Sequence, residues 1–128
     1  MAELTIISET GMFHSACRCT WNGVIEWYGF KPARHRTPVG AGMVDRSDRS
    51  AYINHSITFP INDTVLRVAV SRVAAQYAGK EYVLGVCDCV SFSAEVARQC
   101  ALRAPLVNMT PYGLIQALGW WNKCTAKT

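Results

Sequence analysis

The residue best suited to covalent chemistry is Cys89, which follows Asp88 and begins an apolar helical pattern over residues 89–102. A helix N-terminus presents free N–H groups and a partial positive charge, and both favour a thiolate over a thiol. The same N–H groups can hold the oxyanion that develops on an attacked carbonyl. The position therefore predicts a cysteine nucleophile, with a packed core cysteine in the first helical turn as the structural alternative.

A thiol of ordinary pKa is little ionised near neutrality, so a cysteine nucleophile needs a base within reach. His14 lies early on a predicted hairpin strand that can pack beside the helix of Cys89, and we predict it to be that base. An edge-strand polar residue is its structural alternative. His35 is most simply a solvated side chain in an arginine-rich segment, and His55 a packed or hydrogen-bonded residue of a short strand.

The third role is a group that orients the imidazole, and we assign it to Glu26. The assignment depends on the turn at Asn22-Gly23, a strong hairpin signal. A two-residue turn places Glu26 on the face opposite His14, whereas a three-residue loop with a bulge places both on one face. A cross-strand ion pair between Glu26 and Arg18 is an equally good interpretation.

The elements that position these residues are predicted from periodicity and end signals. Strands are expected over residues 3–7, 13–20, 24–30 and 51–59, with a long surface loop over 31–50. Helices are expected from Asn62 or Asp63 to Gly79, over 89–102, and from Thr110-Pro111 to Leu118. The order predicts an α+β fold in which a small antiparallel sheet packs on helices, within a single domain over 1–128.

Composition limits the classes of partner. The chain has 128 residues and a formal charge of +4, without an arginine-rich arm, so no nucleic-acid partner is expected. No apolar run approaches the ~18 residues of a membrane span. The first nine residues contain two glutamates and no basic segment, so we expect synthesis in the cytoplasm without a signal peptide.

Six cysteines open an alternative of another class, a non-catalytic metal-binding module. Cys17 and Cys19 form one Cys-x-Cys pair and Cys87 and Cys89 another, and residues i and i+2 of a strand share a face. Zinc sites more often have two intervening residues, so buried free thiols are the simpler interpretation, above all for Cys100.

The segment from Tyr77 to Phe92, with Tyr82 and Asp88-Cys89 inside it, resembles the nucleophile region of the NlpC/P60 cysteine peptidases. One departure is Val90-Ser91, where the common family form has Ser-Gly. All three histidines precede Cys89, an order similar to that of the circularly permuted, lecithin retinol acyltransferase-like branch. Residues 13–16 and 21–30 are similar to the histidine hairpin of that branch.

The resemblance implies a papain-like fold, Cys89 and His14 as the catalytic pair, and no metal or cofactor. It also implies that Tyr82 lines the oxyanion pocket and that Asp88 recognises a polar or amine group of the substrate. A packed tyrosine and a helix N-cap are the structural alternatives.

The substrate that the resemblance implies is an amide or peptide bond of bacterial cell-wall peptidoglycan. A minimal catalytic domain of this kind resembles antibacterial toxins that are exported without a signal peptide to the periplasm of a target cell and kept with an immunity protein. Acyltransferase, amidase or deamidase chemistry on lipid or protein substrates with the same two residues is the alternative within this fold.

Overall fold

A computed structural model describes residues 1–11, 13–35 and 37–128. It contains one antiparallel sheet of seven strands in the order β6-β4-β3-β2-β1-β5-β7, together with three α-helices. The strands are β1 (Ala2–Glu9), β2 (Ser15–Trp21), β3 (Val24–Pro32), β4 (Val39–Asp45), β5 (Ile53–Ile61), β6 (Glu81–Val83) and β7 (Ala126–Lys127). The helices are α1 (Asp63–Tyr77), α2 (Cys89–Gln99) and α3 (Pro111–Trp121), and a short 3-10 turn (Ser50–Tyr52) precedes β5. The predicted α+β class is confirmed.

The sheet is larger than expected, because the segment 31–50 is not one long loop. It contains β4, which pairs with β3 on one side and β6 on the other. Two glycines weaken the strand signal of β4, and Gly42 is required by packing. A Cβ there would overlap the ring of Phe30 and lie 2.9 Å from the carbonyl oxygen of Lys80. Tertiary packing therefore fixes a strand that local propensity does not indicate.

The hairpin between β2 and β3 closes with a two-residue turn. Asn22 and Gly23 both have positive φ, 51° and 73°, as the type I′ turn of a tight hairpin requires. Trp21 then pairs with Val24, and Glu26 lies opposite Cys19. This is the register that places Glu26 on the helix-covered face.

The helices begin where their capping residues predict. The Asn62 side chain accepts hydrogen bonds from two backbone N–H groups of α1, and Thr110 caps α3 ahead of Pro111. Asp88 caps α2 in a capping box with Ser91. The cap sets Cys89 as the first residue of α2.

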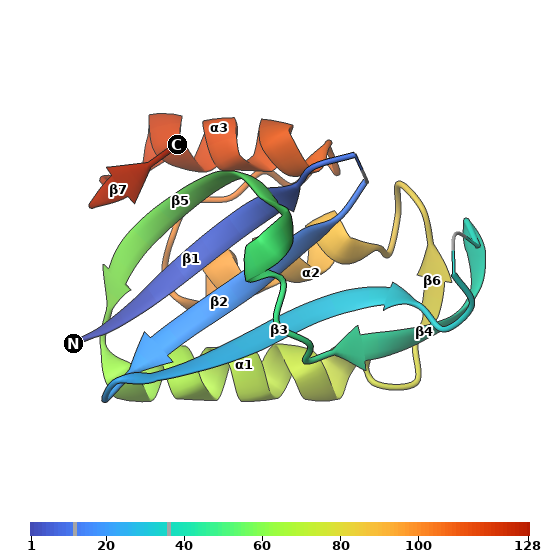
Figure 1. Ribbon diagram of the computed structural model, residues 1–128, viewed down its shortest axis with the longest axis horizontal. Helices are drawn as coiled ribbons and strands as arrows, with labels where there is room; N and C mark the ends of the chain where they lie inside the picture. Colours follow the sequence, from blue (N-terminus) through green and yellow to red (C-terminus); the bar gives the residue numbers. More distant parts are fainter. Residues whose placement is uncertain (12, 36) are drawn as a thin grey trace.

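The three helices and the inner face of the sheet enclose the main core (Figure 1). Helix α2 lies behind β2 and β3, between α3 along one side and α1 along the other. A buried hydrogen bond of 2.8 Å between the hydroxyls of Ser15 and Ser93 ties the start of β2 to α2. Within the described ranges, none of the helices has the length and apolar character needed to cross a membrane.

Candidate active site

Cys89 is fully buried at the first position of α2. Its thiol donates a long hydrogen bond to the carbonyl oxygen of Phe13, with Sγ and O 3.9 Å apart. Phe13 itself is exposed. The sulfur therefore lies at the junction of α2 with the segment that leads into β2.

Burial is the largest influence on the Cys89 thiol and raises its pKa to about 12. The neighbouring Asp88 carboxylate raises the pKa as well, because it repels a thiolate. The backbone N–H of Ser15 and the hydroxyl of Tyr82 act in the opposite direction, since both stabilise the thiolate. In this closed arrangement the thiol is protonated, and the helix N-terminus alone does not ionise it.

Asp88 is buried and acts as a structural acceptor. Its carboxylate accepts hydrogen bonds from the backbone N–H groups of Gly85, Val90 and Ser91. The side-chain amide of Asn108 donates a further bond of 3.1 Å. The structure thus supports the N-cap alternative, and the substrate-binding role expected for Asp88 has no exposed atom to perform it.

His14 is buried just before β2, and its Nε2 atom lies 3.6 Å from Oε2 of Glu9. That separation would allow an ion pair if the ring were protonated but exceeds a hydrogen bond, and Nε2 is without a hydrogen-bond partner. Burial lowers the pKa of His14, while Glu9 raises it and Arg49 lowers it. Burial therefore favours the neutral ring, the form that a base requires.

The backbone of residues 13–15 connects His14 to Cys89. The carbonyl of Phe13 and the N–H of Ser15 both face the sulfur, on either side of the histidine. The described residues include no hydrogen bond between the ring and the thiol. The ring nitrogen Nε2 lies over Gly29, where an added Cβ would be 3.7 Å away.

The assignment of Glu26 as the third catalytic residue is wrong. Its carboxylate accepts hydrogen bonds from Trp21 Nε1 at 2.9 Å and from the Tyr28 hydroxyl at 3.0 Å. It also pairs with Arg46 at 2.9 Å, so the alternative pairing with Arg18 is wrong as well. The two-residue turn is the reason, because it turns the Glu26 side chain away from the His14 region.

The residue that does approach His14 is Glu9, which is not among the site residues predicted from the sequence. Arg49 holds the Glu9 carboxylate with two hydrogen bonds of 2.8 Å, one from Nε and one from Nη2. The Glu9 side chain is only 1% exposed. A glutamate at the end of a strand that leads toward His14 was the available signal, but its partner lies 40 residues along the chain.

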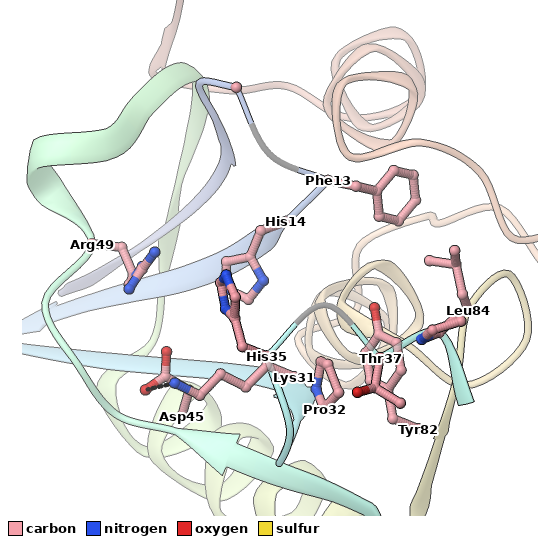
Figure 2. Close-up of a pocket in the computed structure, with 12 residues that line it drawn as sticks. Phe13, His14, Lys31, Pro32, His35, Thr37, Asp45, Arg49, Tyr82 and Leu84 are labelled. Carbon is pink, nitrogen blue, oxygen red and sulfur yellow. Dashed lines mark ion pairs between the residues drawn. The ribbon is translucent and has the colours of Figure 1, made fainter. Parts of the chain in front are cut away.

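A cavity of about 440 Å³ opens beside His14. Figure 2 shows Phe13 and Leu84 on one side of it and Arg49 and Asp45 on the other, with Tyr82 below. His35 lines this cavity from an exposed position, so it lies closer to the candidate site than its sequence context indicated. Tyr82, the predicted oxyanion-pocket residue, lines the cavity and lies close enough to Cys89 for its hydroxyl to lower the pKa of the thiol.

The remaining candidates lie elsewhere. His55 stacks on Tyr112, with ring centroids 4.1 Å apart, and its Nδ1 lies 3.1 Å from the carbonyl oxygen of Thr128. In the part of the chain that the structure describes, no three His, Cys, Asp or Glu side chains are grouped to hold a metal ion. The pairs Cys17, Cys19 and Cys87, Cys89 thus do not form the metal site considered above.

A scan of protein-family models finds no match to this chain, and neither does a search of curated proteins or of solved structures. The chain is accordingly described by its own geometry: a buried thiol at a capped helix start, and a histidine that lines a cavity and lies 3.6 Å from a buried glutamate.

Proposed function

We propose that this protein is a cysteine hydrolase of amide or peptide bonds, with Cys89 as nucleophile and His14 as base. The observation that carries the proposal is the surroundings of the Cys89 sulfur. It lies at the start of α2, faced by the Ser15 N–H and the Tyr82 hydroxyl, and beneath Phe13 and Tyr82, which line a cavity together with His14. Donors arranged around a sulfur at a helix N-terminus stabilise a thiolate and, after attack, an oxyanion.

In the proposed reaction, substrate binding displaces Phe13 and brings the imidazole against the thiol. His14 accepts the proton from Sγ, the thiolate attacks the carbonyl carbon, and a thioester forms as the amine leaves with that proton. Water, deprotonated by His14, then hydrolyses the thioester and regenerates the thiol. Catalytic hydrogen bonds often tighten only when substrate binds, which is consistent with the separate thiol and ring of the closed structure.

The substrate class rests on the resemblance of residues 77–92 to NlpC/P60 peptidases, which favours peptide bonds of bacterial peptidoglycan. Under this proposal the papain-like fold is circularly permuted, and the protein acts as a toxin in the periplasm of a target cell. Its producer would keep an immunity protein against it. Acyl transfer would differ from hydrolysis only in the molecule that takes the acyl group from the thioester.

A test that does not require the natural substrate uses the model ester p-nitrophenyl acetate. We expect a burst of nitrophenolate and an acetyl adduct on Cys89 by mass spectrometry, both absent from Cys89→Ala and strongly slowed in His14→Ala. Cys124→Ala is the matched control, because Cys124 is another free cysteine, which lies after α3 rather than at a helix start. Acetylation of the Cys89→Ala protein at the wild-type rate would refute the nucleophile.

The substrate is tested with purified peptidoglycan. Release of new amino groups without transfer to an added amine would support hydrolysis of wall peptides. Transfer to the amine would support the acyltransferase alternative, and activity on neither wall peptides nor simple amides would contradict the proposed function.

A further inference from the structure

We infer that Glu9 and Arg49 form the positioning pair of the site: Glu9 orients His14 through Nε2, and Arg49 fixes Glu9. The inference rests on the proposed role of His14, and it supplies the third group that Glu26 does not provide. Neither residue touches the reacting atoms, so both are positioning residues.

The Glu9 carboxylate contacts Arg49 and His14. Both carboxylate oxygens accept a hydrogen bond from Arg49, and the two parallel bonds fix the plane of the carboxylate. The same Oε2 faces His14 Nε2. Each oxygen of a carboxylate held in this way keeps a further lone pair, and the ring nitrogen of His14 lies 3.6 Å from Oε2.

The unpartnered ring nitrogen is the second observation. Nε2 of His14 is buried and has no hydrogen bond, although an acceptor lies 3.6 Å away. Leaving a buried polar atom unpaired costs about 1–3 kcal/mol, so such a gap in a well-packed site indicates an arrangement that closes in another state. Protonation of the ring supplies that state, because an imidazolium is drawn to Glu9.

The pair also decides which nitrogen acts as the base. A carboxylate beside Nε2 favours the tautomer with the proton on Nε2, which leaves the lone pair on Nδ1. Nδ1 then takes the proton from the Cys89 thiol, and the resulting imidazolium carries its Nε2–H toward Glu9. One proton moves from sulfur to nitrogen, and no other reactant is required.

Two carboxylates and two cations near the ring act on the His14 pKa in opposite directions, so the effect of each charge can be measured by removing it. Glu9 and Asp45 favour the protonated ring, while Arg49 and Lys31 oppose it, and burial opposes it most. His35 and Tyr82 also line the cavity next to the ring.

The test measures the pKa of His14 in the folded protein, by recording NMR spectra of its ring nitrogens over a range of pH. Glu9→Gln should lower the pKa of His14 by about one unit, the lower end of what one neighbouring charge produces. Arg49→Gln should raise it. Opposite signs from the two ends of one ion pair cannot come from general loosening of the fold. The wild-type spectrum should also show the proton on Nε2 at high pH.

The matched control is Glu26→Gln, which breaks another glutamate–arginine pair on the same sheet, with Arg46, and should leave the His14 pKa unchanged. Equal shifts in Glu9→Gln and Glu26→Gln, or a wild-type Nδ1–H tautomer, would overturn the inference. If Glu9→Gln fails to fold, an Arg49→Gln value at or below the wild-type pKa overturns it equally. These readouts require no catalysis, so their failure is distinct from that of the proposed function, which the acetylation of Cys89 decides.

Discussion

The thiol of Cys89 lies 3.9 Å from the carbonyl oxygen of Phe13, the residue that immediately precedes His14. The exposed ring of Phe13 lines the cavity, while the sulfur beneath it has no exposed surface. The backbone of Phe13 therefore connects the proposed nucleophile to the proposed base, and the side chain of Phe13 lines the cavity. Access to the sulfur depends on displacement of that segment.

Shortening the Phe13 side chain should make Cys89 accessible. We expect Phe13→Ala to increase the rate of Cys89 alkylation by iodoacetamide several-fold, because local opening then exposes the sulfur more often. In the wild type, the partly exposed Cys87 and Cys124 should react before Cys89. Peptide mass spectrometry of timed samples measures all three. Leu84→Ala, which shortens another apolar side chain of the cavity lining, is the control, and equal acceleration by both variants would count against a specific cover by Phe13.

Asp88 should influence both stability and the thiol. Asp88→Ala removes a cap with several acceptor bonds and should cost about 2 kcal/mol in the free energy of unfolding, measured in urea. Asp88→Asn keeps Oδ1 for the helix N–H groups and should cost less, about 1 kcal/mol. Because the Asp88 charge raises the pKa of Cys89, the asparagine variant should also lower that pKa.

The comparison for this effect is Asn62→Ala at the start of α1, which removes a cap of similar kind away from the cysteine. It should lower stability without changing the pH dependence of Cys89 alkylation. A Cys89 pKa unchanged in Asp88→Asn would show that the carboxylate charge does not reach the sulfur.

His14 should give the folded protein a pH-dependent stability of known sign. Burial lowers its pKa below the usual 6.5, so the unfolded chain binds a proton more readily than the folded one. The stabilising contribution of the neutral ring is complete above pH 6.5 and declines as pH falls from there through the folded pKa. His14→Gln should therefore flatten the loss of stability on acidification, measured as urea unfolding between about pH 8 and pH 5. His35→Gln provides the comparison with an exposed ring, and an unchanged slope in His14→Gln would contradict the effect of burial.

Glu26 should be a structural residue only. Glu26→Ala leaves Trp21, Tyr28 and Arg46 without their shared acceptor and should lower the free energy of unfolding by about 1–2 kcal/mol. Nitrophenolate release from p-nitrophenyl acetate should be unchanged, since no contact of Glu26 leads to His14. A tenfold decrease in the rate of acetylation in this variant would show that Glu26 is a catalytic residue after all.

Local sequence signals determined the parts of the site that depend on neighbouring residues. An apolar helical pattern predicted Cys89 at a helix start, with the cap as the structural alternative for Asp88, and Asn22-Gly23 predicted the hairpin. These predictions are confirmed because caps and tight turns are specified by side chains within a few residues of one another. The α+β class followed from the same local patterns.

The tertiary structure decided what depends on distant segments. The strand β4 forms because Gly42 admits the ring of Phe30, and the carboxylate beside His14 is Glu9 because Arg49 arrives from beyond β4. Burial of the Cys89 sulfur, and with it a raised pKa, comes from packing against residues 13–15 and Tyr82. Pair partners, strand register and desolvation arise when segments far apart in the chain meet, and no local pattern encodes those contacts.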